Sequence, residues 1–282
     1  MNPLIGVPEL AAALASAHPP VLFDVRFPPA SPGRAAYQDN HLPGAAFIDR
    51  DEVLAGPPGT EPGERGGRHP LPDPADLQEA LRGLGVTEDH PVVVYDEGGA
   101  PPSGSAARAW WILRWAGHPD VRLLDGGYAA WVSDGRPVTT RETTRPRGDF
   151  TVRPGSMPVL DAAGAAARAA AGALLDARAP VRFRGEEEPL DPVAGRIPGA
   201  RNLPIAATAG PDGRFLPPEA LEAVTKELPI NQQIGTYCGS GITAAHIALA
   251  LTTIGYEPAV YIGSWSEWIT DPSRPVETGE PS

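Results

Sequence analysis

Four short sequence patterns occur twice along this chain of 282 residues, and both times they come in the same order. The paired stretches, first copy and then second, are 22–26 with 174–178, 41–45 with 196–200, 93–96 with 235–238, and 124–131 with 261–268. Four ordered matches indicate two similar domains, because composition alone would not preserve their order. A polar stretch rich in proline and arginine lies between the copies and has the composition of a linker. We therefore assign the domains to residues 1–140 and 159–282, joined by a linker at 141–158.

Each copy alternates short apolar runs, typical of strands, with longer stretches rich in alanine and leucine, typical of helices. In the second copy we expect strands at 173–176, 199–204, 234–238 and 259–262, and helices at 218–227 and 243–254. Alternating strands and helices predict an α/β domain with a mostly parallel sheet and helices on both faces. In such sheets, ligands bind at the carboxyl ends of the strands.

The composition excludes several classes of protein. A net charge of -12 argues against a nucleic-acid-binding surface. No apolar run approaches the roughly 20 residues of a membrane span, and the N-terminus lacks the features of a secretory signal. The single cysteine cannot form an intramolecular disulfide and provides no cysteine cluster for a metal. We expect a cytoplasmic, monomeric protein without a bound metal, which binds neither nucleic acid nor membrane.

The single cysteine, Cys238, ends a predicted strand and is followed by Gly239, Ser240 and Gly241 before a predicted helix. The N–H groups of such a loop, together with the positive end of the helix, converge on the sulfur and favour its thiolate form. A lone cysteine is otherwise often a small buried apolar side chain. The two glycines favour a functional cysteine, because a core cysteine needs no close approach of the backbone. The equivalent residue of the first copy is Asp96, which cannot be a sulfur nucleophile, so we expect the first domain to be non-catalytic.

These residues resemble the rhodanese superfamily in its tandem two-domain form. The loop at 238–244 resembles that of 3-mercaptopyruvate sulfurtransferases, and the stretches 41–45 and 263–268 resemble the two signature stretches of the family. The resemblance implies two rhodanese-like domains and a sulfurtransferase that needs no cofactor. Its cysteine would take a sulfane sulfur from a small anionic donor, 3-mercaptopyruvate or thiosulfate, and become a persulfide. The acceptor would be cyanide, a thiol or a thioredoxin-like protein.

Backbone N–H groups could stabilise such a persulfide without a charged side chain in the loop. The residues expected to provide them are Gly239, Ser240, Gly241, Ile242 and Thr243. We also expect Thr243 to cap the following helix.

The resemblance further implies a relay from the cysteine through a serine to an aspartate. Ser240 matches the loop serine, although a small turn-forming residue would look the same. The acidic partner follows the stretch 41–45, and the register favours Asp51, with Asp49 as the alternative. A surface acid at the start of a loop would also fit this position.

Three residues are candidates for binding the donor. Arg182 matches the principal substrate arginine of the family, and its planar fork suits a carboxylate. The second arginine of the family follows a Glu-Pro pair, but here Leu190 follows that pair, which weakens the expectation of a strong preference for mercaptopyruvate. Arg196 is a candidate substitute. His69 matches a family histidine near the pocket, and a histidine exposed on a loop is the alternative.

Other conspicuous residues are expected to serve the structure. Asp176 and Arg178 recur as Asp24 and Arg26 in the copy that lacks the cysteine. His246 falls one turn into the helix after the loop, where a packing role is more common than a catalytic one.

Two other functions compete with sulfur transfer. A phosphatase of similar fold uses a Cys-x5-Arg loop, but Ala244 occupies the position of that arginine. A non-catalytic or sulfur-carrying module that docks a protein partner is the stronger alternative. The intact loop at Cys238 argues against an inactive module.

Overall fold

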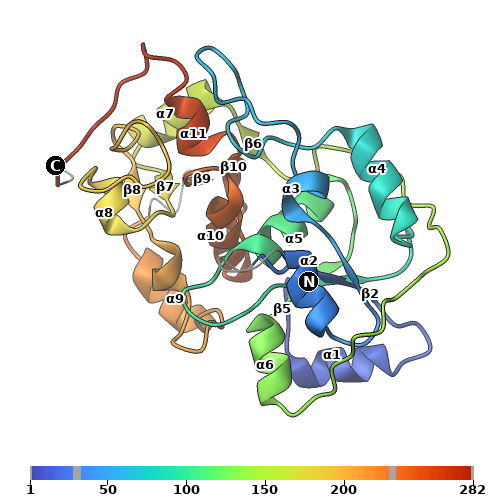
Figure 1. Cartoon of the computed structure of the whole chain (residues 1–282). Helices are drawn as coiled ribbons and strands as arrows, with labels where there is room; N and C mark the ends of the chain where they lie inside the picture. The colour runs from blue at the N-terminus through green and yellow to red at the C-terminus, as the bar shows by residue number, and fades with distance from the viewer. Residues whose placement is uncertain (1, 28–32, 229–232, 281–282) are drawn as a thin grey trace. The chain divides into compact units, whose positions relative to one another are not determined.

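The computed structural model describes residues 2–27, 33–228 and 233–280 (Figure 1). The chain divides into two compact units. The first unit contains Met1–Ala55, Pro72–Met157 and Ala209–Phe215, and the second contains Gly56–Leu71, Pro158–Thr208 and Leu216–Ser282. These units differ from the ranges 1–140 and 159–282 because two segments fold with the other repeat. The segment Gly56–Leu71 from the first half belongs to the unit that contains Cys238.

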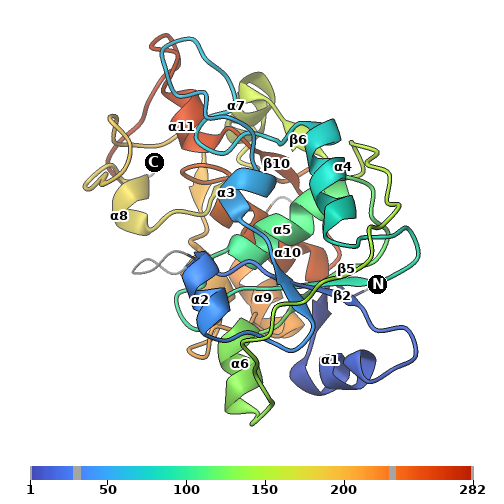
Figure 2. The ribbon, with the colours of Figure 1, turned by 45° about the vertical axis from the view of Figure 1, so that its right-hand side comes forward.

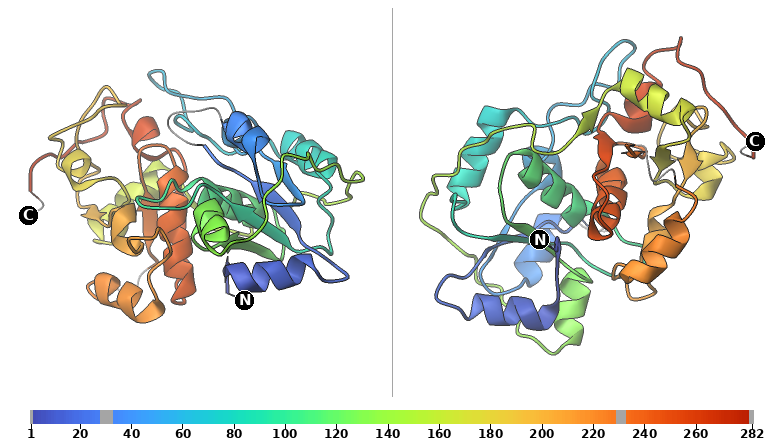
Figure 3. Two further views of the ribbon diagram at one scale, coloured as in Figure 1. Left: turned by 60° about the horizontal axis from the view of Figure 1, so that its bottom comes forward. Right: turned by 180° about the vertical axis from the view of Figure 1, so that it is seen from behind.

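The first unit is built on a five-stranded sheet with the strand order β1-β5-β4-β2-β3, in which every pair is parallel. Its strands are β1 (Leu4–Ile5), β2 (Val21–Asp24), β3 (Ala45–Phe47), β4 (Val92–Tyr95) and β5 (Val121–Leu124). Its helices are α1 (Val7–Leu14), α2 (Gly33–Asp39), α3 (Arg50–Val53), α4 (Pro74–Gly83), α5 (Ser105–Trp115) and α6 (Gly127–Ser133). Helices α1 and α6 lie side by side (Figure 3), where Leu10 and Trp131 join one buried cluster with Leu22 and Val93 of the sheet.

The second unit repeats this arrangement with the strand order β6-β10-β9-β7-β8, again parallel throughout. Its strands are β6 (Val159–Leu160), β7 (Leu174–Asp176), β8 (Arg201–Asn202), β9 (Gly235–Tyr237) and β10 (Ala259–Tyr261). Its helices are α7 (Ala162–Ala170), α8 (Pro180–Phe183), α9 (Pro218–Thr225), α10 (Ile242–Thr253) and α11 (Ser264–Trp268), with a 3₁₀ turn at Ile205–Thr208. The identical strand order confirms that the two copies share one α/β fold.

Two neighbouring residues of β9 show that helices cover both faces of the second sheet. Thr236 donates its hydroxyl to the carbonyl of Ala244 in α10, at 3.1 Å. Tyr237 packs with Ala165 of α7 and Trp265 of α11. Because successive side chains of a strand point to opposite faces, α10 covers one face and α7 and α11 cover the other.

Helix α10 is apolar on all sides and packs against β9 and β10 (Figure 2). Its residues are buried from Ala244 to Leu251, as expected for a helix without a polar face. It has only 12 residues. In the described part of the chain, no helix is both long and apolar enough to cross a bilayer.

The stretch with linker composition is packed against the first unit up to Met157. The backbone N–H of Gly148 donates to the carbonyl of Arg82 at 2.8 Å, and that of Arg153 donates to the carbonyl of Ala116 at 2.7 Å. The side chain of Phe150 is completely buried. This stretch therefore has the polar composition of a linker, but it follows a fixed path along the first unit.

Candidate active site

Cys238 lies directly after β9, at the carboxyl end of its strand, and the loop Gly239–Gly241 leads from it into α10. Its thiol is buried. Gly241 occupies the N-cap position of α10 with φ 82°, a conformation that glycine adopts at little cost. The expectation that Thr243 caps α10 is wrong. A helix capped by Thr243 would begin at residue 244, whereas α10 begins at Ile242 and its N-cap is Gly241, which has no side chain to cap it.

Two backbone N–H groups of the loop donate to the sulfur. The N–H of Ser240 lies 3.4 Å from Sγ of Cys238, and the N–H of Gly241 lies 3.0 Å from it. Donors in this arrangement, at the N-terminus of a helix, favour negative charge on the sulfur. The remaining loop N–H groups and the hydroxyl of Ser240 keep their proposed roles as predictions.

Helix α11 holds this loop from one side. The backbone N–H of Cys238 donates to Oγ of Ser264 at 3.1 Å. In return, Trp265 and Ser266 donate their N–H groups to the carbonyls of Cys238 and Gly239, both at 2.9 Å. Ser264 has φ 54°, which is uncommon for a residue other than glycine. The signature stretch 263–268 therefore fixes the backbone of the cysteine loop.

Two guanidinium groups lie over Gly239. A Cβ atom added there would be 3.1 Å from Nη2 of Arg68, and 3.4 and 3.6 Å from Nη2 and Nη1 of Arg182. A side chain at this position would therefore be in tight contact with Arg68 and in ordinary van der Waals contact with Arg182. Arg182 was predicted from the sequence, whereas Arg68 was not. The only sequence signal for Arg68 was its place next to His69.

Arg68 reaches the cysteine loop because α11 also holds the segment Gly56–Leu71. The backbone N–H of Arg68 donates to Oγ of Ser266 at 3.0 Å. Thr270 binds the same segment twice, by accepting from the N–H of Gly63 at 3.0 Å and by donating to the carbonyl of Glu64 at 2.9 Å. His69 lies in this segment beside Arg68, and its role at the site stays a prediction.

Two buried carboxylates pair with these arginines. Asp191 contacts both of them, through Nη1 of Arg68 and through Nη2 of Arg182, the latter at 3.3 Å. Glu188 also pairs with Arg182, at 2.5 Å. Burial raises the pKa of Glu188, but the hydrogen bond and the charge of Arg182 outweigh it and hold this pKa below its usual value. Burial raises the pKa of Asp191 above its ordinary value, although the charges of Arg68 and Arg182 oppose this shift. The pKa shift therefore favours the ionised form of Glu188 but not that of Asp191.

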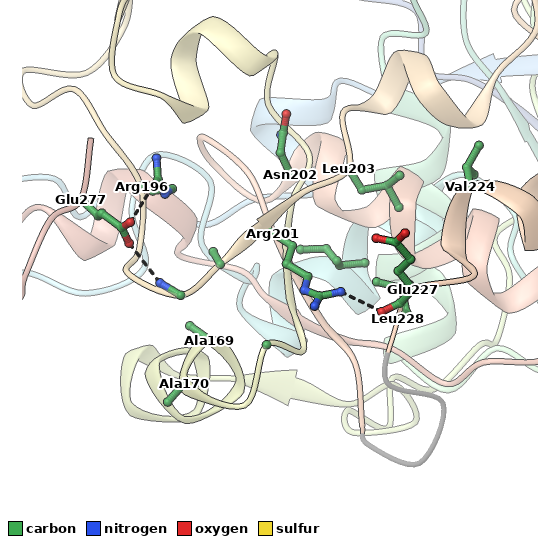
Figure 4. A pocket seen from close by; sticks show the side chains of 14 residues that line it. Ala169, Ala170, Arg196, Arg201, Asn202, Leu203, Val224, Glu227, Leu228 and Glu277 are labelled. Carbon is green, nitrogen blue, oxygen red and sulfur yellow. Dashed lines mark hydrogen bonds and ion pairs between the residues drawn. The ribbon is translucent and has the colours of Figure 1, made fainter. Parts of the chain in front are cut away.

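Arg196 has other partners (Figure 4). Its buried guanidinium pairs with Glu277 at 2.6 Å, donates to the carbonyl of Gly279 at 2.6 Å, and lies 4.6 Å from the ring centre of Phe183. It also lines a cavity of about 620 Å³, whose described lining includes neither Cys238 nor Arg182. These contacts tie the C-terminal segment to the second unit. The substrate role of Arg196 stays a prediction.

The two candidate acids lie in the first unit, at α3. Asp49 is the N-cap of this helix and accepts from the N–H groups of Asp51 and Glu52 at 2.9 and 3.2 Å. Asp51 is paired with Arg50 at 2.9 Å, with 41% of its side chain exposed. The capping role of Asp49 favours Asp51 as the acid for a relay. That relay remains a prediction, because Asp51 and Cys238 belong to different units.

The loop of the first unit that corresponds to the cysteine loop is occupied by its own carboxylate. Oδ2 of Asp96 accepts from the hydroxyl of Ser103 at 2.8 Å and from the N–H of Ala106 at 3.1 Å. Oδ1 accepts from the N–H of Gly98 at 3.2 Å. The side chain of Asp96 thus accepts the donors of the first loop, in the place where the second loop presents a sulfur.

His246 is buried within α10, where desolvation lowers its pKa from the ordinary 6.5 to about 3. The folded protein therefore keeps this histidine neutral, whereas the unfolded chain protonates it below pH 6.5. The contribution of neutral His246 to the free energy of unfolding is complete above pH 6.5. It should be lost as the pH falls towards 3, by about 2 kcal/mol between pH 6.5 and 5. Urea unfolding at the two pH values should show this loss in the wild type, and a smaller loss in His246→Leu. An equal loss in both proteins would contradict the assignment.

The described residues contain no group of three or more His, Cys, Asp or Glu side chains that could hold a metal ion. The groups that the structure brings together at the site are the thiol of Cys238, two backbone donors and two guanidinium groups.

Known proteins share both the fold and the tandem organisation. The Rhodanese-like domain family matches residues 7–134 and 161–271. A Pseudomonas aeruginosa protein named "Probable 3-mercaptopyruvate sulfurtransferase" is 47% identical over 287 residues, which cover 98% of each chain. The thiosulfate sulfurtransferase of Cricetulus griseus is 36% identical over 251 residues, which cover 84% of this chain and 82% of the relative. The crystal structure of SseA from Escherichia coli, described as a 3-mercaptopyruvate sulfotransferase with the rhodanese fold, superposes with a TM-score of 0.80 at 30% identity and covers 95% of this chain and all of its own.

The chain therefore belongs to the rhodanese family. Within that family its class is the tandem-domain sulfurtransferases, in which two rhodanese domains follow one another in a single polypeptide.

Proposed function

We propose that the protein transfers a sulfane sulfur from 3-mercaptopyruvate or thiosulfate to a thiophilic acceptor through a persulfide on Cys238. The observation that carries this proposal is the pair of backbone N–H groups, from Ser240 and Gly241, that donate to Sγ. The names of the relatives supply both donors, since one is called a 3-mercaptopyruvate and another a thiosulfate sulfurtransferase.

In the first half-reaction the Cys238 thiolate attacks the outer sulfur of the donor. With 3-mercaptopyruvate, the carbon–sulfur bond breaks, its electron pair stays on carbon, and the thiol proton moves to that carbon, which gives pyruvate. With thiosulfate, the sulfur–sulfur bond breaks and its electron pair leaves on sulfite. In both cases Cys238 becomes a persulfide anion, and the net charge is conserved. The loop N–H groups and the N-terminus of α10 stabilise that anion.

In the second half-reaction an acceptor nucleophile attacks the outer sulfur of the persulfide. The bond between the two sulfurs breaks, and its electron pair returns to Sγ of Cys238. Cyanide yields thiocyanate, and a thiolate yields a new persulfide. No external oxidant or reductant is needed, because the sulfur and its electrons pass from donor to acceptor.

Intact-protein mass spectrometry tests the proposal directly. After incubation with either donor and removal of the excess, the wild type should gain the mass of one sulfur atom, and cyanide should remove that mass with release of thiocyanate. A protein that gains no sulfur from either donor would instead be a non-catalytic module. The ratio of kcat/KM for the two donors then defines the preferred one.

A further inference from the structure

The first unit contains a cavity that the proposed reaction does not use. Its volume is about 470 Å³, and all of its described lining residues belong to the first unit, whereas Cys238 belongs to the second. A cavity of this size accommodates a small organic molecule. Apolar side chains make up most of its wall, namely those of Ala11, Leu14, Pro19, Pro43, Trp131 and Pro137.

Hydrogen bonds fix the wall that the stretch with linker composition contributes. The indole N–H of Trp131 donates to the carbonyl of Pro137 at 2.8 Å. Two residues further along, the backbones of Thr139 and His41 exchange hydrogen bonds in both directions, each at 2.9 Å. This wall therefore needs no ligand to form.

The guanidinium groups of Arg136 and Arg145 are the only charged groups in the described lining of the cavity. Arg136 is paired with Asp134 at 2.8 Å, and 37% of its side chain is exposed. Within the part of the chain that the structure describes, no carboxylate pairs with Arg145, and burial alone lowers its pKa. The cavity therefore contains one cation whose charge is balanced and one whose charge is not.

Arg145 is held in place by uncharged groups. Its Nη2 atom donates to the carbonyls of Pro20 and Gly44, both at 3.3 Å. Its aliphatic stem packs on Gly85, where an added Cβ would lie 2.7 Å from Cβ of Arg145. Its Nε atom is buried without a hydrogen-bond partner among the described residues. A partly buried cation without a counter-ion loses hydration that nothing replaces, and an anion in the cavity would offset that loss.

The second unit has a different charge balance at the corresponding place (Figure 4). There the bridge between His41 and Thr139 is matched by a bridge between Arg196 and Glu277, and these two side chains form an ion pair at 2.6 Å. Glu227 and Glu277 both line the cavity of about 620 Å³ described above. The described lining of the first cavity includes no acidic residue. An anion should therefore prefer the first cavity to the second.

We propose that the cavity of the first unit is a separate binding site for a small monocarboxylate with an apolar body. The apolar wall contacts the body, and the guanidinium of Arg145 binds the carboxylate, whose planar shape matches it. A single negative charge is favoured, because Arg136 already has a partner in Asp134. The site is independent of sulfur transfer, so it stands or falls apart from the function proposed above.

Isothermal titration calorimetry of the full chain with 3-phenylpropionate tests this site. Saturable binding is expected at millimolar or lower concentration. 3-Phenylpropionamide lacks the charge and propionate lacks the ring, so each should bind at least roughly 10-fold more weakly. Equal binding of the acid and its amide, or no saturable binding of the acid, would overturn the inference. Tighter binding of phenyl phosphate, a dianion, would contradict the assignment to monocarboxylates.

Arg145→Met keeps an unbranched side chain but removes the charge, so it should raise Kd for 3-phenylpropionate roughly 10- to 100-fold. Arg147→Met is the matched control, because Arg147 lies in the same stretch but pairs with Glu79 on the surface at 2.6 Å. Its Kd should stay at the wild-type value. Equal changes of Kd in the two variants would mean that only the overall charge matters, and would refute a site at Arg145.

Ala11→Phe covers the case in which Arg145→Met does not fold. Ala11 lines the cavity, whereas its neighbour Ala12 is exposed on the same helix. The larger side chain should abolish binding at position 11, and Ala12→Phe should bind like the wild type. Unchanged binding in Ala11→Phe would count against the site.

Arg182→Gln distinguishes the cavity from the site at Cys238, where a carboxylate could also bind. This variant should keep the wild-type Kd for 3-phenylpropionate. Loss of binding in Arg182→Gln but not in Arg145→Met would assign the ligand to the sulfur-donor site and overturn the inference. The activity of the wild type with sulfur donors bears only on the proposed function.

Discussion

Replacing Cys238 with serine is expected to abolish sulfur transfer while leaving the fold intact. A serine hydroxyl fills nearly the same space and can accept from the N–H groups of Ser240 and Gly241, which now donate to Sγ at 3.4 and 3.0 Å. It is not ionised near neutral pH and cannot form a persulfide. Thiocyanate formation from either donor should fall by at least roughly three orders of magnitude, as when a covalent nucleophile is removed from other enzymes.

The chain provides its own control for this experiment. Asp96 occupies the equivalent loop position in the first unit, where its carboxylate accepts from Ser103 and Ala106. Asp96→Asn should keep the activity of the wild type and should still gain one sulfur atom in the mass spectrum. Thiocyanate production by Cys238→Ser at a rate comparable to that of the wild type would exclude the persulfide mechanism.

Arg178→Met should cost the second unit about 3–5 kcal/mol of stability, because it leaves the buried carboxylate of Asp176 without its cation. Arg178 pairs with Asp176 at 2.7 Å and with Glu188 at 3.4 Å, donates to the carbonyl of Gly195 at 2.7 Å, and is almost completely buried. Its guanidinium also lies 4.9 Å from the ring of Trp265. Hydrogen exchange of peptides that contain β7 and β9 measures the loss within this unit.

The matched variant is Arg26→Met in the first unit. Arg26 pairs with Asp24 at 2.8 Å in the same sequence context, and it lies 4.3 Å from the ring of Tyr128. This variant should accelerate exchange in β2 and β4 and leave β7 and β9 protected. If Arg178→Met changed exchange in neither pair of strands, the buried ion pair would not have the structural importance assigned to it.

Much of this architecture follows from local sequence patterns. The repeated stretches predict two equivalent sheets, and both sheets have the same strand order. The strand–cysteine–glycine–helix pattern at 235–253 predicts the loop at the carboxyl end of β9, because apolar β-branched residues, glycine turns and alanine-rich helices each act over a few residues. Gly241 shows the limit of such rules. Threonine is a favourable capping residue, but the N-cap of α10 is Gly241, which has a positive φ, and not Thr243.

Contacts between residues far apart in sequence could not be predicted in this way. Arg68 and Asp191 are separated by 123 positions, and Arg196 and Glu277 by 81. Neither pair leaves a periodic or compositional trace, because an ion pair depends on where two surfaces meet. The resemblance singled out His69 but not its neighbour, whose guanidinium lies over Gly239.

The segment Gly56–Leu71 lies in the first half of the sequence but folds with the second unit. This difference between the two repeats matters when the second unit is expressed alone. A polypeptide that starts at Pro158 would contain Cys238, Arg182 and α11. It would lack the segment Gly56–Leu71, which contains Arg68. Ser266 and Thr270 would lose the backbone groups that they bind. The unit that contains Cys238 is therefore complete only when the segment Gly56–Leu71 from the first half of the sequence is supplied with it.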